Sequence, residues 1–303
     1  MYNVAIIGAG LISSGFDDID DKRILTHAHA IVAHDKFNLC GFYDIKKENS
    51  EAAAKKWNTI AFSKIGDIKD VQIITIATPD AFHLESFRYA VSLKPKLIIL
   101  EKPIARTIEE AKEIIALSKD TPVAINFSRR YVKEFQDLAI KIKKGVWGEF
   151  ITGRGIYGKG FIHNGSHMLD LLNLFLGKIT NIKTYDKISD FYKNDPTRTI
   201  QITFKNNRNF LAQALDCNIA TVFELELFFE KKRIQILNSG EKIVFYEIEN
   251  CRNGYKFFKY ENEINTELNF AMYNLYENAY NFLDKNQKLF APINEVFEEK
   301  LYV

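Results

Sequence analysis

Lys102 stands where a charged side chain could act on a bound ligand. It follows the apolar run Leu97–Leu100 and Glu101, and it precedes Pro103. Such a run predicts a strand buried on both faces, and proline cannot extend a central ladder, so the strand should end here. Ligands of open parallel sheets bind beyond the carboxyl ends of the strands, where Lys102 is expected. The alternative is a lysine that only carries its ammonium group from the rim of the sheet into water.

His167 is the second candidate for chemistry. It lies three residues before Asp170, so on a helix the two side chains share a face, and the carboxylate could orient the imidazole and raise its pKa. The alternative is a buried histidine with a structural hydrogen bond. An imidazole suits proton transfer, and an ammonium group beside a reacting oxygen stabilises negative charge. Both are needed when a hydride leaves an alcohol carbon, because the hydroxyl proton must leave as well.

A glycine-rich turn follows the first predicted strand, Val4–Ile7. Gly8 would allow the tight turn, and Gly10 would let the backbone approach a pyrophosphate, with Leu11 and Ile12 opening the next helix. Strand, glycine pair and helix start are in the order that a dinucleotide site needs. The third glycine of this pattern is replaced by Ser13, whose hydroxyl could bond phosphate but whose Cβ lies where helix and strand usually pack closely.

Further polar residues stand at predicted strand ends. The second strand, Asn38–Asp44, ends in a carboxylate that could bind the adenosine ribose hydroxyls, which favours NAD over NADP. Lys46 and Lys47 follow and could instead hold a 2′-phosphate. The remaining cofactor candidates at such ends are Ala77, Thr78, Pro79, His83, Glu101 and Asn126. His83 could contact the nicotinamide ribose or be a polar residue of a first helical turn.

An acidic stretch, 17–21, separates the glycine turn from a helix expected over 23–33. Carboxylates would not be placed against a pyrophosphate, so the stretch is expected to be a solvated loop, with Asp21 or a neighbour capping the helix. His27 and His29 are two residues apart and do not share a helical face, which argues against a metal pair. Either a structural role or contact with the cofactor is open to them.

The chain of 303 residues suggests two domains. Strands and helices alternate up to Asn126, which predicts a doubly wound parallel sheet in a domain over 1–123. Strands joined by short turns predominate afterwards, so 124–303 is expected to form a substrate and oligomerisation domain with a large, mostly antiparallel sheet. One helix is expected near 166–175 and a late one over 265–283. The open face of this sheet predicts a homodimer or homotetramer.

Composition excludes several classes of protein. With 26% charged residues and a formal net charge of +2, neither a nucleic-acid partner nor a membrane surface is indicated. No signal peptide is recognisable at the N-terminus, and no apolar run reaches the roughly 18 residues of a membrane span. Cys40, Cys217 and Cys251 lack metal-binding spacing, so we expect reduced thiols, no metal and a cytoplasmic location.

These motifs in this order resemble the Gfo/Idh/MocA oxidoreductase family over nearly the whole length. The resemblance rests on Gly8-Ala9-Gly10, Ala77–Asp80 with His83, Glu101-Lys102-Pro103, Arg130, and Gly165-Ser166-His167 with Asp170. It implies a Rossmann domain, an α/β domain with an open sheet, and reversible oxidation of a sugar or polyol hydroxyl with NAD(P). It also implies that Lys102 polarises the reacting oxygen and His167 exchanges its proton, with Asn126 and Arg130 near nicotinamide and substrate.

One departure from the family concerns the substrate. Many members carry an aspartate four residues before the active-site histidine, and this chain has His163 there. A carboxylate that would repel anions is thus replaced by an imidazole, so His163 joins Lys102 and His167 in the expected constellation. With Arg129, Arg130 and Lys159 expected nearby, the substrate would be anionic, such as a nucleotide-linked sugar or a sugar acid.

Two further functions are left open. Within enzymes, the cofactor could serve an imine or enone reductase, or a non-redox reaction with a transient oxidation. In a different class, the chain would be a catalytically silent nucleotide-binding regulator. Retention of Lys102 and His167 argues against the silent protein, whereas His163 leaves it open.

Overall fold

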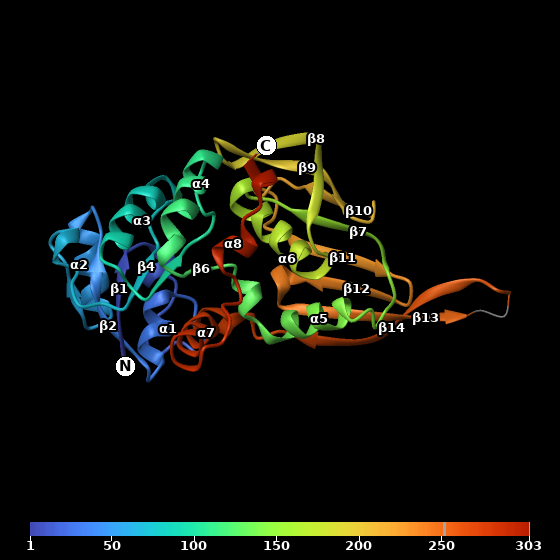
Figure 1. The fold of residues 1–303 in the computed structure, drawn as a ribbon. Coiled ribbons are helices and arrows are strands. Elements are labelled where there is room, and N and C mark those ends of the chain that lie inside the picture. Colours follow the sequence, from blue (N-terminus) through green and yellow to red (C-terminus); the bar gives the residue numbers. More distant parts are fainter. Residues whose placement is uncertain (251–252, 303) are drawn as a thin grey trace. The chain divides into compact units, whose positions relative to one another are not determined.

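The computed structural model describes residues 1–250 and 253–302, which form two compact units (Figure 1). Unit 1 contains residues 1–131, 269–297 and 302, and unit 2 contains residues 132–268 and 298–301. Each unit is therefore built from more than one stretch of the chain. The first boundary between the compact units lies after Tyr131, and residues 269–297 also belong to unit 1. The domain boundary between residues 123 and 124 stays a prediction.

Unit 1 is built on a parallel sheet with the strand order β3-β2-β1-β4-β5-β6. The strands are β1 Tyr2–Ile7, β2 Phe37–Tyr43, β3 Ile60–Ala61, β4 Ile73–Ile76, β5 Leu97–Leu100 and β6 Val123–Ile125. All residues of β4, β5 and β6 are buried, as strands covered on both faces require. The predicted doubly wound Rossmann sheet is confirmed.

Helices connect the strands of unit 1. They are α1 His27–Ala33, α2 Lys47–Lys56, α3 His83–Ser92 and α4 Ile108–Leu117. Because β2 and β4 both neighbour β1, chain direction across the sheet reverses between β1 and β4. That reversal is the switch point at which ligands of such sheets bind, beyond the carboxyl ends of the strands.

Residues 269–297 complete unit 1. The late helix expected over 265–283 begins later than predicted, and α7 spans Ala271–Lys285, followed by the short α8 Ile293–Val296. The buried Tyr276 of α7 reaches Thr75 of β4, and the backbone of Ile125 in β6 donates to the carbonyl of Ala291. These contacts join segments far apart in sequence, which local patterns do not reveal.

The acidic stretch is a solvated loop only in part. Asp18, Asp20 and Asp21 are exposed, but Asp17 is buried and accepts hydrogen bonds from the backbone N–H of Leu25 and Thr26. Thr26, rather than Asp21 or a neighbour, caps α1, because its hydroxyl accepts from the N–H of His29. The helix accordingly begins at His27 and not at residue 23. Hydrogen bonds from Leu25, Thr26 and His29 replace the water that Asp17 loses, so this carboxylate is buried although acidic runs usually lie in solvent.

Unit 2 contains a mixed sheet in the order β14-β13-β12-β11-β7-β10-β9-β8. Its strands are β7 Phe150–Tyr157, β8 Ile179–Tyr192, β9 Asp195–Phe204, β10 Asn209–Ala214, β11 Phe223–Phe229, β12 Lys232–Leu237, β13 Lys242–Asn250 and β14 Lys256–Asn265. β7 and β10 run parallel and the other neighbours antiparallel. The mostly antiparallel class is confirmed, but β14 was missed, because residues 256–264 were assigned to no element and a helix was expected to begin at residue 265. Cys251 lies outside the described residues.

Two helices of unit 2, α5 Lys133–Lys143 and α6 Ser166–Leu176, pack against each other. A Cβ on Gly155 of β7 would lie 3.0 Å from the methyl group of Met168, so α6 lies directly on this strand. On the next strand, Phe210 is buried whereas Leu211 is exposed. This alternation is typical of an antiparallel sheet with one covered and one open face.

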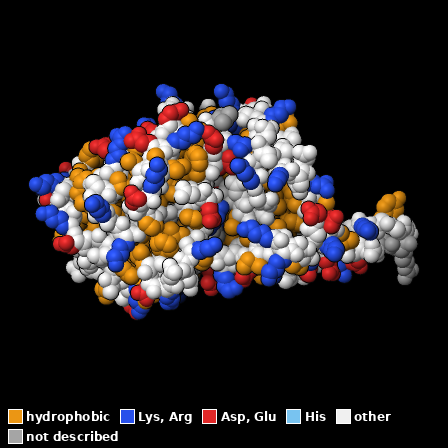
Figure 2. Space-filling view, viewed as in Figure 1, with side chains coloured by type: hydrophobic (Ala, Val, Ile, Leu, Met, Phe, Trp, Pro, Cys, Tyr) orange, Lys and Arg blue, Asp and Glu red, His pale blue; other side chains and the backbone are white. Residues whose placement is uncertain are grey.

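The surface is mixed in charge. Figure 2 shows Lys and Arg side chains interleaved with Asp and Glu over the face in view, as a formal net charge of +2 leads one to expect. Among residues 1–250 and 253–302, every helix is too short or too polar to cross a bilayer.

Candidate active site

The loops that follow β1 and β4 touch at the switch point of unit 1. Gly8 has φ +98°, and a Cβ there would lie 2.6 Å from the backbone of Ala77 and Thr78. Only glycine tolerates both the backbone conformation and this close approach. Gly8 therefore holds the turn against the end of β4, as the sequence predicted for a tight turn.

The second glycine of the turn differs from the first. A Cβ on Gly10 would meet no described protein atom within 4 Å. Packing within the protein therefore does not require glycine at this position, and the space beside it is open. Leu11 is exposed and Ile12 half-buried, in a single π-helical turn that ends at Gly15. The helix expected after the glycines is thus one turn long. The hydroxyl of Ser13 donates to the carbonyl of Gly10 at 2.9 Å, which commits it to the turn itself.

Asp44 lies at the end of β2, beside the glycine turn. Its Oδ2 accepts a hydrogen bond from the N–H of Ala9 at 2.8 Å, and its Oδ1 accepts from the N–H of Lys46 at 2.9 Å. The half-buried carboxylate is therefore fixed in orientation next to the segment that would receive a pyrophosphate. This is the position in which an acidic residue binds ribose hydroxyls in dinucleotide folds.

Three buried side-chain polar atoms lack a hydrogen-bond partner among the described residues, and two of them, Thr78 Oγ1 and Asn126 Oδ1, belong to residues at the carboxyl edge of the sheet. Thr78 follows β4, and Asn126 follows β6. Buried polar groups in native structures are nearly always hydrogen-bonded, so these atoms suit a polar ligand. Together with the open space at Gly10, they fit a dinucleotide whose nicotinamide end carries a carboxamide and a ribose.

Glu101 anchors a buried hydrogen-bond network beneath Lys102. Its Oε1 accepts from Asn126 Nδ2 at 2.6 Å and pairs with His27 Nε2 at 3.0 Å. The other ring nitrogen of His27 lies 3.1 Å from the hydroxyl of Tyr276. Burial opposes the charged carboxylate, but the hydrogen bonds from His27 and Asn126 and the nearby charge of Lys102 outweigh burial and lower the pKa of Glu101. The side chain is therefore an ionised acceptor.

This network connects the predicted cofactor residues Glu101 and Asn126 and gives His27 a structural role. Because Glu101 holds the amide nitrogen of Asn126, the amide oxygen is turned away from it. His27 thus belongs to the wall of the predicted site rather than to a metal pair. Tyr276, which sequence reasoning missed, keeps its proton because burial raises its pKa.

His83 joins two loops of the predicted cofactor groove. Its Nδ1 lies 2.9 Å from the carbonyl of Pro103, and its Nε2 lies 3.0 Å from the carbonyl of Thr78. Burial lowers the pKa of the imidazole, and a neutral ring donates through one nitrogen at a time. The ring therefore spans the turns after β4 and β5 from within, and its contact with the nicotinamide ribose stays a prediction.

Lys102 follows directly after β5 and is half-buried. Its backbone N–H is 3.3 Å from Glu101 Oε2, so the carboxylate network also orients the start of this loop. Arg129 and Arg130 belong to a short 3₁₀ turn and are buried. Arg130 donates to the carbonyl of Phe290 at 3.3 Å, which ties part of its guanidinium to unit 1. Their predicted contact with substrate stays untested.

In unit 2, a π-helical turn, Phe161–Gly165, runs directly into α6. His163 lies in the turn and His167 in the first turn of α6, where it is half-buried. Asp170 is buried on the same helix. The segment therefore presents two imidazoles four residues apart, and the predicted pairing of His167 with Asp170 remains a prediction.

His163 has a partner that sequence reasoning missed. Its Nδ1 lies 2.7 Å from Asp195 Oδ2, at the start of β9, and its ring stacks on Tyr192 with centroids 3.7 Å apart. No local pattern could have found this contact, because 32 residues separate the pair. Lys159, a predicted substrate residue, lies with its ammonium group 4.7 Å from the ring centre of Phe191.

Known proteins are similar to parts of this chain. Residues 2–127 match a family described as "Oxidoreductase family, NAD-binding Rossmann fold". Levoglucosan dehydrogenase of Pseudarthrobacter phenanthrenivorans is 31% identical over 138 residues, which is 45% of this chain and 32% of that protein. Inositol 2-dehydrogenase of Corynebacterium glutamicum is 28% identical over 162 residues, 51% of this chain and 44% of that protein. The matched segments span less than half of these relatives.

A solved structure shows the same fold. The WlbA dehydrogenase from Bordetella pertussis, in complex with NADH and UDP-GlcNAcA, is similar with a TM-score of 0.78 at 16% identity, covering 97% of this chain and 91% of that chain. Because the identity is low, this likeness concerns the fold. The family match covers the residues that build the glycine turn, the β4 loop and the Lys102 loop. Residues 2–127 of this chain therefore match the Gfo/Idh/MocA oxidoreductase family, whose description is an NAD-binding Rossmann fold.

Proposed function

We propose that the protein oxidises a hydroxyl group of a sugar or sugar derivative, or reduces the corresponding ketone, with a nicotinamide dinucleotide. The observation that carries this proposal is the carboxyl edge of the unit 1 sheet. Four neighbouring strands, β1, β4, β5 and β6, are followed there by the Gly8 turn, Thr78, Lys102 and Asn126 in that order. Thr78 and Asn126 each carry a buried polar atom without a partner among the described residues. The relatives named as dehydrogenases of levoglucosan and inositol support this reaction class.

In this proposal the cofactor is NAD, held by residues of unit 1. Asp44 binds the adenosine ribose, Gly10 with Leu11 and Ile12 receives the pyrophosphate, and Asn126 Oδ1 accepts from the carboxamide. When bound, the cofactor supplies hydride transfer at its nicotinamide ring. Thr78, Pro79 and Ala77 line its path between the two ends.

Two groups of the chain serve the reacting alcohol. Lys102 places its ammonium group beside the substrate oxygen and stabilises the negative charge that develops there. An imidazole of the segment with His163 and His167 takes the hydroxyl proton, and the resemblance to the family assigns this role to His167. Glu101, fixed by His27 and Asn126, keeps the Lys102 loop in place.

We expect Asp44→Ala to weaken NAD⁺ binding and to reduce the preference for NAD⁺ over NADP⁺. Loss of hydrogen bonds to a charged group costs about 1.5–3 kcal/mol, which corresponds to at least roughly tenfold in Kd. Isothermal titration of both dinucleotides measures this effect. The matched control is Asp35→Ala, since Asp35 pairs with Lys36 at the other end of β2. Tighter binding of NADP⁺ than NAD⁺ by the wild type would contradict the cofactor assignment.

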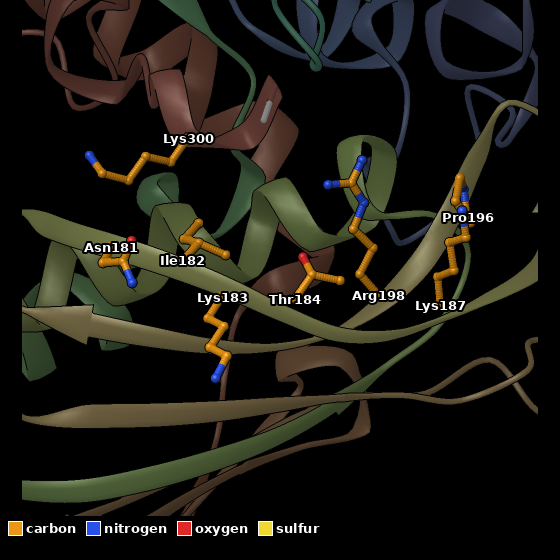
Figure 3. A pocket seen from close by; sticks show the side chains of 8 residues that line it. All are labelled: Asn181, Ile182, Lys183, Thr184, Lys187, Pro196, Arg198 and Lys300. Atoms are coloured by element: carbon orange, nitrogen blue, oxygen red, sulfur yellow. The ribbon is translucent and has the colours of Figure 1, made fainter.

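A groove of about 720 Å³ in unit 2 supports an anionic substrate. Lys183, Lys187 and Arg198 line it from β8 and β9, and Lys300 lines it from the 3₁₀ turn Glu299–Tyr302. None of its lining residues among the described part of the chain is acidic. Figure 3 shows Arg198 and Lys183 extending to opposite sides of the strands. The guanidinium of Arg198 lies 4.8 Å from the ring centre of Phe161, at the start of the turn that carries His163. Its charge is thus close to that turn.

Sugars that carry a phosphate or carboxylate should therefore bind more tightly than neutral sugars and should drive reduction of NAD⁺. We expect Arg198→Gln to weaken the anionic sugars about tenfold or more, whereas Lys205→Gln, which removes a charge from the turn after β9, should leave them unchanged. Isothermal titration and the absorbance of the reduced nicotinamide measure both effects. Tighter binding of the neutral sugars would refute the anionic substrate class.

Association and location belong to the same proposal. The exposed face of the unit 2 sheet, with Ile156 and Leu211 on neighbouring parallel strands, supports a homodimer or homotetramer through that face. Cys40 and Cys217 are free thiols, which supports a reducing compartment such as the cytoplasm.

A further inference from the structure

A hydrogen-bonded imidazole and carboxylate form a compact polar cluster in unit 2. Asp195 Oδ2 lies 2.7 Å from His163 Nδ1. The same carboxylate accepts from the backbone N–H of Ile162 at 2.9 Å and of His163 at 3.0 Å. These two backbone hydrogen bonds fix the position of the Asp195 carboxylate independently of the charge of the imidazole.

Neighbouring groups fix this carboxylate further. A Cβ on Gly160 would lie within 2.3 Å of Asp195 Oδ2, so any side chain there would displace it. The adjacent loop is held by Thr197, whose hydroxyl accepts from the N–H of Gly160, and by Asp190, which accepts from the N–H of Lys159. Burial opposes ionisation of Asp190, but the hydrogen bond from Lys159 and further donors outweigh burial and lower its pKa.

The hydrogen bond sets the tautomer of His163. A carboxylate only accepts, so Nδ1 carries the proton and the basic lone pair is on Nε2. The ring is further held by stacking on Tyr192, with an angle of 14° between the planes. An imidazole oriented by a carboxylate through Nδ1 is the arrangement in which Nε2 takes a proton and the carboxylate stabilises the resulting imidazolium.

Exposure distinguishes His163 from the structural histidine pairs of unit 1. The side chains of His29, paired with Asp17, and His34, paired with Glu277, are only 5% and 2% exposed, whereas His163 is 20% exposed. A ring that serves packing alone gains nothing from exposure. The combination of a buried, fixed carboxylate and an accessible ring is expected of a group that exchanges protons with a ligand.

We infer that His163, positioned by Asp195 and Tyr192, is the general base and acid of the proposed reaction, a role that the resemblance gave to His167. The inference rests on the proposed function. In the oxidation, the hydroxyl proton passes to His163 Nε2, the electron pair of the carbon–hydrogen bond leaves as hydride to the oxidised nicotinamide, and the C=O double bond forms. Asp195 then faces the imidazolium of His163. In the reduction, the same proton returns to the oxygen.

The test compares the pH dependence of kcat/KM for oxidation in His163→Asn, His163→Gln and the wild type. We expect wild-type activity to fall toward low pH as His163 becomes protonated, and both variants to lose this dependence together with about 10²- to 10⁴-fold of the rate. The control is His34→Gln, which removes a carboxylate-paired, tyrosine-stacked imidazole from the amino edge of the unit 1 sheet and should leave the profile unchanged. A retained low-pH decrease in both His163 variants would overturn the inference.

A second measurement separates the positioning role of Asp195 from a structural one and needs no substrate. Nitrogen-15 NMR of the histidine side chains should show His163 as the Nδ1–H tautomer in the wild type. In Asp195→Asn the imidazolium loses its anionic partner, so the pKa of His163 should fall. The opposite tautomer in the wild type, or an unchanged titration in Asp195→Asn, would contradict the inference even if the wild type reduced no cofactor. Failure of the proposed function would instead appear as absent nicotinamide binding in unit 1.

Discussion

Replacing Lys102 by alanine should lower kcat by about 10²- to 10³-fold, equal to roughly 2.7–4 kcal/mol of transition-state stabilisation. The ammonium group is expected to act on charge that develops only as the reaction proceeds, so substrate and cofactor should still bind. Steady-state kinetics and titration with NAD⁺ separate the two effects. A fall in kcat with an unchanged Kd for NAD⁺ is the expected result.

The same strand offers a matched control for Lys102. Lys96 directly precedes β5, at its amino end, and its ammonium group lies 5.6 Å from the ring centre of Tyr2. Lys96→Ala removes the same charge and length of side chain from the edge of the sheet where no ligand is expected, so its kcat should match the wild type. Near-normal turnover by Lys102→Ala, or an equal loss in both variants, would refute the assigned role.

Replacing Glu101 by alanine should have the largest effect on stability. It would leave the buried donors His27 Nε2 and Asn126 Nδ2 without their acceptor, at about 1–3 kcal/mol for each unsatisfied group. Urea denaturation should therefore show a free energy of unfolding lower by about 2–6 kcal/mol. The control Glu113→Ala removes a carboxylate from an exposed pair with Arg88, which is worth about 0–1 kcal/mol. Equal losses in the two variants would contradict the network.

The pH dependence of stability follows from the same carboxylate. Because the folded-state pKa of Glu101 is lowered, its contribution is fully present above the unfolded pKa of about 4.3 and is lost as the pH falls through the lower folded value. The difference in unfolding free energy between the wild type and Glu101→Gln should be constant near neutral pH and should shrink in acid. A difference that grows as the pH falls would mean that the buried carboxylate has a raised pKa.

The sequence predicted most of unit 1 because its signals are local. Each signal lies at the end of a predicted strand: Lys102 after one apolar run, the glycine pair after Val4–Ile7, and Asp44 at the end of the second strand. Parallel strands bring such ends to one edge of the sheet. The prediction therefore needed only the strand positions and the rule for this fold. The burial of Asp17 was missed because its donors, including Thr26, depend on the path of an irregular loop.

Contacts over long sequence distances could not be predicted in the same way. Tyr276 reaches His27 across 249 residues, and Asp195 reaches His163 across 32. Neither partner carries a motif, since a single tyrosine on a helix or an aspartate at a strand start is common. The helix that carries Tyr276 therefore looked like a closing element of the second domain, and His163 looked like an isolated departure from a family pattern.

A crystal structure of the protein with NAD⁺ would show whether the carboxyl edge of the unit 1 sheet binds the dinucleotide. We expect the pyrophosphate against Gly10 and Leu11, the adenosine ribose on Asp44, and the nicotinamide carboxamide within hydrogen-bond distance of Asn126 Oδ1, with Lys102 beside the nicotinamide ring. A dinucleotide bound away from these residues, or crystals grown with saturating NAD⁺ and NADP⁺ that hold neither at the carboxyl edge of the sheet, would contradict it.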